Sequence, residues 1–166
     1  MKQWISLLLT ALLLCTPAAA LEQPSEEELS IGAPAAILIE RETGTVLYEK
    51  NADERLSPAS VTKIMTLLLI FEQLDSGQLS TDTVVTASAN ACAVGGSQIW
   101  LKEGVQMAVD EMFKCIAVSS AHDCAVAMAE HICGSEAAFT KRMNERAQAL
   151  GMENTHFLNS TGLTHD

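Results

Sequence analysis

The stretch Ser-Pro-Ala-Ser-Val-Thr-Lys (residues 57–63) places a hydroxyl group and an amine three residues apart at the start of a predicted helix. Ser57 is suited to cap that helix and Pro58 to occupy its first position, which puts Ser60 in the first turn. Ser60 and Lys63 then lie on one face of the helix, within reach of each other. This spacing is that of a nucleophile and its base.

The sequence after Lys63 supports that interpretation. Residues 64–74 are apolar around nearly the whole circumference of a helix, which predicts a buried helix ending at the Asp-Ser-Gly of 75–77. Burial lowers the pKa of a lysine, and a neutral lysine can take the proton of a serine hydroxyl. The positive end of the helix dipole also favours negative charge at Ser60. The alternative is a capping serine with a solvated lysine, but such a lysine should have polar neighbours.

The N-terminus predicts export. Residues 1–20 combine a basic start, a short apolar segment and an Ala-Ala-Ala ending, which is typical of a signal peptide cleaved after Ala20. The apolar segment is too short to span a bilayer comfortably. A lipid on Cys15 is disfavoured because small residues are missing around that cysteine. We therefore expect the protein in the cell envelope: at the outer face of the cytoplasmic membrane, in the periplasm or outside the cell.

The charge composition limits the classes of molecule that could bind this protein. The formal net charge is −11, and loss of Lys2 with the signal peptide moves it to about −12. An acidic surface repels phosphate backbones, which argues against nucleic acid as a partner. Residues 21–33 are predicted to be a leader, and residues 34–166 form part of one catalytic domain without internal linkers.

The mature chain has four cysteines, at positions 92, 115, 124 and 133. Export permits disulfides. However, Cys124 and Cys133 are predicted on one helix about 13 Å apart, which is too far to bridge. Their apolar flanks favour buried free thiols. The spacing of Cys124, His122 and His131 is not that of metal ligands, so no metal site is predicted.

Periodicity and turn residues predict the remaining elements. Two β-rich runs around the loop 41–44 predict a β-hairpin with strands at 35–40 and 45–49. One further short strand is predicted at 84–86. The segment 152–163 is predicted to be a loop that contains at most one short strand. Helices are predicted at 105–118, 122–132 and 135–150.

Three stretches carry a family resemblance. The runs Glu40–Lys63, Ala117–Glu130 and Phe157–Leu163 resemble, in this order, the secreted serine-type D-alanyl-D-alanine carboxypeptidases, which are low-molecular-weight penicillin-binding proteins. The likeness extends from about Ala35 to the last residue. It implies an α/β protein of the α+β type, with the penicillin-binding/β-lactamase-like transpeptidase fold. In that fold a helical cluster packs on an antiparallel sheet.

The resemblance implies a function and roles for three residues. Ser60 would attack the carbonyl between the two terminal D-alanines of a peptidoglycan stem peptide and form an acyl-enzyme. Lys63 would accept the proton of Ser60, and Ser120 would relay a proton to the departing D-alanine. Half of an oxyanion hole would come from the backbone N–H of Ser60. β-Lactam antibiotics would acylate Ser60 as inhibitors, and no metal or organic cofactor is needed.

One departure from the family lies in the triplet Ser120-Ala121-His122, where relatives have asparagine in the third place. His122 is therefore a candidate substrate-binding residue. Neutral histidine offers a donor and an acceptor as asparagine does, but at different positions. A charged His122 would repel protonated Lys63 and could not accept a hydrogen bond. The alternative is that His122 is a tolerated replacement without a role of its own.

A second departure is that no lysine in this sequence is followed by Thr-Gly, the third element of the family. In the family that strand lines the substrate groove and helps to complete the central sheet. We therefore expect a domain incomplete at its C-terminus, with an unpaired strand edge and an exposed apolar helix face. A membrane-anchoring segment, common in relatives, could follow in the full-length protein.

Two alternatives to a carboxypeptidase stay open. One is a non-catalytic module that binds penicillin or peptidoglycan, which the incomplete groove and His122 would allow. The other is a serine β-lactamase, which shares the Ser-x-x-Lys motif. That enzyme needs an efficient base for deacylation, and no acidic residue here has a context that suggests this role.

Overall fold

The computed structural model describes residues 31–164, so the predicted signal peptide (1–20) and most of the predicted leader lie outside the described residues. The chain divides into two compact units, one up to Glu54 and one from Arg55 onward, and each is described by itself. Within the described part, no helix has both the length and the apolar character needed to cross a membrane.

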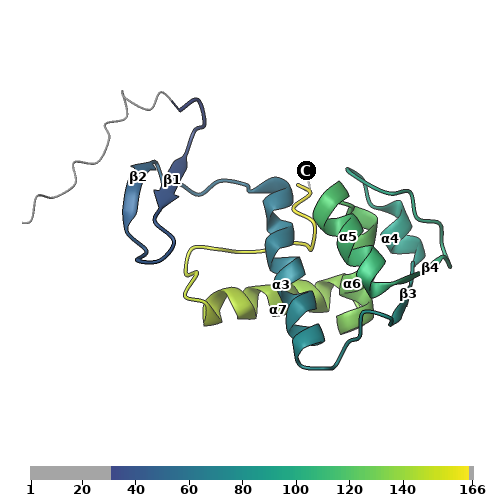
Figure 1. The fold of residues 1–166 in the computed structure, drawn as a ribbon. Helices are drawn as coiled ribbons and strands as arrows, with labels where there is room; N and C mark the ends of the chain where they lie inside the picture. Colours follow the sequence, from purple (N-terminus) through teal and green to yellow (C-terminus); the bar gives the residue numbers. More distant parts are fainter. Residues whose placement is uncertain (1–30, 165–166) are drawn as a thin grey trace, which may run out of the picture. The chain divides into compact units, whose positions relative to one another are not determined.

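The first unit contains the predicted β-hairpin. Strand β1 (Ala36–Ile39) pairs antiparallel with β2 (Val46–Lys50) (Figure 1). The Glu40 carboxylate closes the turn by accepting hydrogen bonds from the N–H and the hydroxyl of Thr43, both at 2.6 Å. The sheet has only these two strands among the described residues, and the apolar side chains of β1 after its first residue are exposed. The hairpin, to which no further strand is paired among the described residues, confirms the predicted hairpin and its unpaired edge.

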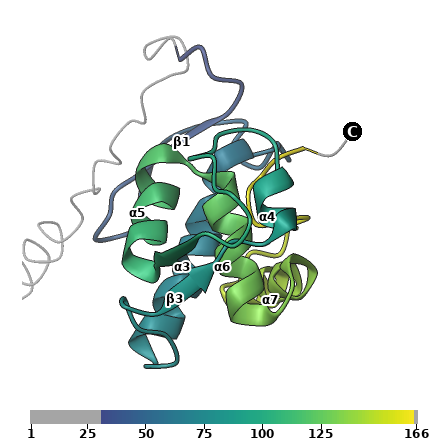
Figure 2. The same cartoon turned by 90° about the vertical axis from the view of Figure 1, so that its right-hand side faces the viewer.

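The second unit is mainly helical, and helix α6 lies at its centre (Figure 2). Residues 124–129 of α6 are all buried, and the alanines among them allow neighbouring elements to approach closely. Helix α6 contacts α3, α4, α5, α7 and β3. The elements of this unit are η1 (Ala59–Thr62), α3 (Lys63–Asp75), β3 (Val84–Thr86), α4 (Ala89–Ala93), β4 (Gln106–Ala108), α5 (Val109–Ser119), α6 (His122–Cys133) and α7 (Glu136–Ala149).

Helices α6 and α7 begin and end close to their predicted limits. Ser135 caps α7, because its side chain accepts a hydrogen bond from the N–H of Ala138 at 3.1 Å. The apolar face of α7 is buried in a cluster with Met65 and Leu69 of α3. All four cysteines in the described residues are free; Cys124 is fully buried, as predicted, whereas Cys133 is only partly buried.

The prediction was wrong between residues 87 and 108. Helix α5 begins at Val109, not near Val105, because residues 106–108 form strand β4, which pairs antiparallel with β3. Helix α4 was not predicted, although Ser88 caps it by accepting a hydrogen bond from the N–H of Ala91. Strands and helices this short depend on their tertiary partners, so periodicity does not reveal them. The segment 152–163 contains no strand.

Helix α3 has a buried side and an exposed apolar side. Leu69 and Ile70 are fully buried, whereas Ile64 and Phe71 have more than half of their surface exposed, 67% and 51%, as does Val61 of the preceding turn η1, at 62%. This arrangement confirms the exposed apolar helix face predicted from the sequence.

After α7 the chain returns to the N-terminal end of α3, as the yellow segment in Figure 1 shows. Asn144 of α7 holds the beginning of this return. Its side-chain oxygen accepts a hydrogen bond from the N–H of Phe157 at 2.7 Å, and its side-chain N–H donates to the Phe157 carbonyl at 2.8 Å. Phe157 is buried against α3 and α7. The Asn144 side chain thus pairs with both the N–H and the carbonyl of Phe157, as a neighbouring strand would do in a β-sheet.

Asn144→Ala is expected to lower the free energy of unfolding by about 2–3 kcal/mol, because both hydrogen bonds to Phe157 are lost and two groups of Phe157 are left unpaired. Urea denaturation followed by circular dichroism measures the change. Asn154→Ala, at an exposed position ten residues further along the chain, is the matched control and should change stability little. Equal stabilities of the two variants would contradict this account of the return segment.

Candidate active site

Ser60 and Lys63 are brought together by a change in helix type. Residues Ala59–Thr62 form a 3₁₀ turn, η1, and α3 begins at Lys63. In a 3₁₀ turn residues i and i+3 lie directly above one another. Lys63 Nζ consequently lies 3.1 Å from Ser60 Oγ, within hydrogen-bond distance. The predicted cap was wrong: Pro58 is the N-cap residue and no side chain caps the turn, because the turn starts one residue later than expected.

The backbone just before Ser60 is strained. Ala59 has φ +46°, in the left-handed region that costs a non-glycine residue about 1–2 kcal/mol. Such a conformation persists only where the surrounding structure holds it. Here Gly162 is packed against the Ala59 carbonyl: a Cβ on Gly162 would lie 1.8 Å from that oxygen and 2.7 Å from Thr62 Oγ1. The return segment therefore supports the turn that presents Ser60.

Lys63 is almost completely buried, with 3% of its surface exposed, whereas Ser60 faces solvent. Burial lowers the pKa of Lys63 to about 8. Lys63 Nζ also donates a hydrogen bond to the Thr161 carbonyl at 2.9 Å. A neutral Lys63 can accept the proton of Ser60 and still donate to Thr161, so the pair has the geometry of a nucleophile and a general base.

Hydrogen bonds within the return segment aim the Thr161 carbonyl at Lys63. Asn159 Oδ1 accepts from the N–H groups of Thr161 and Gly162 at 3.1 and 2.7 Å. Thr66 Oγ1 of α3 donates to the Ser160 carbonyl at 2.7 Å. Glu136 of α7 accepts from both the N–H and the hydroxyl of Ser160. No role was predicted for these residues, and the only signal for them in the sequence is the family resemblance of residues 157–163.

His122 is brought into the same region. It is 5% exposed, its Nδ1 lies 2.7 Å from the Gly95 carbonyl, and its backbone N–H donates to the Ser97 carbonyl at 2.7 Å. The pKa of His122 is lowered, first by burial and then by the nearby charge of Lys63. The lowered pKa favours the neutral form of His122, and its Nε2 is buried without a hydrogen-bond partner.

Ser120 lies at the corner between α5 and α6. It has φ +54°, and its N–H donates to the Cys115 carbonyl, which ends α5. Its side chain is partly exposed. Among residues 31–164, no hydrogen bond joins Ser120 Oγ to Ser60 or Lys63, so the structure does not show the predicted proton relay as a direct contact.

The loop between α4 and β4 is tied to the first turn of α6. The fully buried Asp123 accepts hydrogen bonds from the N–H groups of Ile99 and Leu101, at 3.4 and 3.0 Å. Between them Trp100 adopts φ +62° with 77% of its surface exposed. Together with the bonds of His122 to Gly95 and Ser97, these contacts fix the loop 95–101 against the helix that carries His122.

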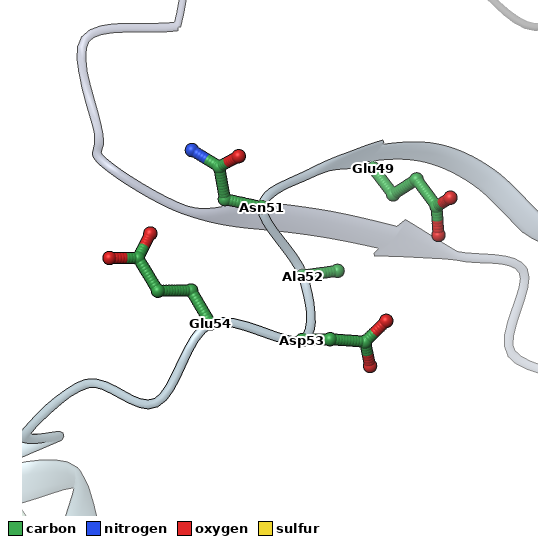
Figure 3. A pocket seen from close by; sticks show the side chains of 5 residues that line it. All are labelled: Glu49, Asn51, Ala52, Asp53 and Glu54. Atoms are coloured by element: carbon green, nitrogen blue, oxygen red, sulfur yellow. The ribbon is translucent and has the colours of Figure 1, made fainter.

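A separate open pocket of about 600 Å³ lies in the first unit, lined by Glu49, Asn51, Ala52, Asp53 and Glu54. Figure 3 shows that its three carboxylates point in different directions and do not converge. None of the predicted site residues lines it. In the described residues no group of three or more His, Cys, Asp or Glu side chains could hold a metal ion.

Solved structures show which class of protein this fold defines. The chain is similar to the D-alanyl-D-alanine carboxypeptidase DacD from Francisella tularensis, with a TM-score of 0.79 and 41% identity over 82% of this chain and 33% of that one. It is also similar to penicillin binding protein 5 from Haemophilus influenzae, with a TM-score of 0.80 and 30% identity over 88% of this chain and 42% of that one. The fold is that of the penicillin-binding proteins, with helices and antiparallel sheets as expected.

The chain belongs to the D-alanyl-D-alanine carboxypeptidase family, peptidase family S11, whose model matches residues 20–166. It is 51% identical to DacF of Bacillus subtilis over 100% of this chain and 44% of DacF. It is 39% identical to DacA of Escherichia coli over 82% of this chain and 35% of DacA. The chain thus spans less than half the length of these two curated relatives.

Proposed function

We propose that this chain contains the nucleophile and base of an exported serine-type D-alanyl-D-alanine carboxypeptidase, which removes the terminal D-alanine from peptidoglycan stem peptides. The observation that supports this most directly is the 3.1 Å separation of Lys63 Nζ from Ser60 Oγ, with Lys63 buried and Ser60 exposed. A buried amine beside an accessible hydroxyl is suited to acyl transfer and needs no metal or organic cofactor.

In the proposed reaction Ser60 Oγ attacks the carbonyl carbon between the two terminal D-alanines. Its proton passes to neutral Lys63, whose new ammonium group is stabilised by the Thr161 carbonyl. The C–N bond then breaks, and the departing amine takes a proton that reaches it from Lys63 through the Ser120 hydroxyl. Water hydrolyses the Ser60 ester in the second half of the reaction and releases the shortened peptide. For this relay Ser120 must approach Lys63 once substrate is bound.

β-Lactams are the expected inhibitors, because they place a strained acyl group where the peptide carbonyl would lie. One similar solved structure, penicillin-binding protein D2 from Listeria monocytogenes at 31% identity and a TM-score of 0.75, is described in its ampicillin-bound form. We extend β-lactam binding to Ser60 of this chain as part of the proposal. Residues 1–20 support export to the cell envelope, which is a further part of the proposal.

Incubation with a fluorescent penicillin tests the proposal. The chain should become covalently labelled, Ser60→Ala should abolish labelling, and intact mass spectrometry should show one drug adduct per chain. Ser57→Ala, at an exposed position one turn away, is the control and should label like the parent chain. A folded chain that is never labelled would contradict the proposal, and rapid loss of label with hydrolysed drug would indicate a β-lactamase.

A non-catalytic binding module is the second candidate. It is favoured by the lack of a direct bond from Ser120 to Ser60 or Lys63 in the described residues. Under this hypothesis a folded chain would bind peptidoglycan fragments reversibly, with no adduct at Ser60.

A further inference from the structure

We propose that the Asn159 carboxamide is a positioning residue for the general base: it fixes the backbone carbonyl of Thr161 in front of the Lys63 amine, and it does so without adding a charge to the site. This inference deepens the proposed function and rests on it. Asn159 acts through the backbone, because its described hydrogen bonds go to the return segment and not to Ser60 or Lys63.

Both ends of the Asn159 side chain are bonded within the return segment. Its Oδ1 accepts hydrogen bonds from the N–H of Thr161 at 3.1 Å, from the Thr161 hydroxyl at 3.2 Å and from the N–H of Gly162 at 2.7 Å. Its Nδ2 donates to the Leu163 carbonyl at 2.7 Å. An asparagine side chain that pairs with the backbone just after it fixes the conformation of a turn, here that of residues 160–163.

The bond to Gly162 sets the direction of the Thr161 carbonyl. The N–H of Gly162 and the carbonyl of Thr161 belong to one planar trans peptide group and point in opposite directions. Because Asn159 Oδ1 accepts from that N–H, the carbonyl points away from Asn159, and it meets Lys63 Nζ at 2.9 Å. The carbonyl can only accept, so it holds one hydrogen of a neutral amine and leaves the lone pair free for Ser60 Oγ, 3.1 Å away.

The Asn159 side chain is enclosed by the segment that it organises. Asn159 is 7% exposed and Thr161 is 2% exposed. The triplet Asn-Ser-Thr of 159–161 matches a glycosylation acceptor, but the amide nitrogen that would carry the sugar is buried and donates to Leu163. Removal of the amide would leave two backbone N–H groups and one carbonyl without partners, which is unfavourable in a buried turn. The turn would then rearrange, and the Thr161 carbonyl would lose its direction.

The neutrality of the amide matters because Lys63 must lose its proton to act. Burial lowers the pKa of Lys63 to about 8. Residues 159–163 contain no ionisable side chain. A carboxylate at position 159 would place a negative charge one peptide group away from the amine, which favours the ammonium form and raises the pKa of Lys63.

The other ionisable groups on the elements packed around this pair are already engaged or lie further along their helices. Glu136 of α7 accepts the N–H and the hydroxyl of Ser160. At the start of α6, Asp123 accepts backbone N–H groups, and the lowered pKa of His122 favours its neutral form. The remaining charged side chains lie in the last turn of α3 and its approach (Glu72, Asp75) and in the first half of α5 (Asp110, Glu111, Lys114).

Two substitutions at this position should have different effects. Asn159→Asp keeps the shape of the side chain and the bonds accepted by Oδ1, and these donors hold the carboxylate ionised. The pKa of Lys63 should rise by about one unit, so penicillin acylation should reach its plateau about one pH unit higher and be about tenfold slower at neutral pH. Asn159→Ala removes the bonds that orient the carbonyl and should lower the plateau itself by about 10–100-fold.

NMR on the chain tests the inference without any need for activity. The Lys63 pKa, followed through the Cε resonance, should rise in Asn159→Asp. It should stay near the parent value in the control Asn144→Ala, which loosens the same segment at Phe157 but, in the described residues, has no hydrogen bond to 159–163. Amide spectra establish that each variant is folded. In the parent chain the Gly162 N–H should exchange slowly with solvent, and this measurement needs no variant.

Three results would overturn the inference: an unchanged Lys63 pKa in folded Asn159→Asp, a parental acylation plateau in folded Asn159→Ala, or a Gly162 N–H that exchanges as fast as an exposed amide. A merely structural role for Asn159 would lower stability, as in Asn144→Ala, without moving the pKa. If the parent chain itself is not acylated, the proposed function fails. The NMR titration and the exchange rate then still decide whether Asn159 positions Lys63.

Discussion

Gly162→Ala is expected to lower the free energy of unfolding by about 2–5 kcal/mol, the largest stability effect of any single methyl group added at a described glycine. Gly162 has φ +80°, where an alanine is strained, and the new Cβ would lie 1.8 Å from the backbone oxygen of Ala59. The chain must move apart at this contact, which withdraws the Thr161 carbonyl from Lys63. Labelling of Ser60 by penicillin should fall together with stability.

The variant Gly151→Ala separates the strain of a positive φ from the collision of the new Cβ with Ala59. Gly151 also has a positive φ, +75°, but a Cβ there would meet no atom within 4 Å. This variant should cost only the conformational strain, about 1 kcal/mol, and should leave labelling unchanged. Urea denaturation measures the free energy of unfolding of the two variants, and label intensity measures their acylation by penicillin. If the two variants were equally stable, the close packing of Gly162 on the turn before Ser60 would be disproved.

Lys63→Met is expected to reduce the rate of penicillin acylation by about 10²–10⁴-fold, the usual contribution of a general base. Methionine is similar in length and apolar, so it can occupy the buried site without a charge. In the parent chain the rate should rise with pH and level off above the Lys63 pKa of about 8, because only the neutral amine can accept the Ser60 proton. Stopped-flow or timed labelling at a series of pH values measures both the loss of rate in Lys63→Met and the pH dependence of the parent chain.

The same pKa shift predicts a change in stability. Lys63 is protonated less readily in the folded chain, with a pKa of about 8, than in the unfolded chain, where the ordinary value of 10.5 applies. The folded state is therefore penalised below pH 8, and stability should increase as the pH rises from about 8 to about 10.5. Lys63→Met should lack this rise. An acylation rate that does not depend on pH, with no such stability change, would refute the assignment of Lys63 as the base.

Much of the helical part could be predicted because its signals are local. The cap Ser135 and the spacing of apolar residues along α7 are properties of one helix, and the same is true of the alanine-rich α6. Strand β4 and helix α4 could not be predicted in this way. Both are shorter than two helical turns or four strand residues, and they are stabilised by contacts with β3 and α6.

The sequence by itself determined the pairing of Ser60 with Lys63, because a separation of three residues puts two side chains on one face in either kind of helical turn. It also indicated that the lysine is buried, through the apolar residues around it. Tertiary structure alone decided what surrounds this pair. The Thr161 carbonyl, Gly162 and the loop that holds His122 come from distant parts of the chain, and only packing brings a backbone oxygen from position 161 to within 2.9 Å of an amine at position 63.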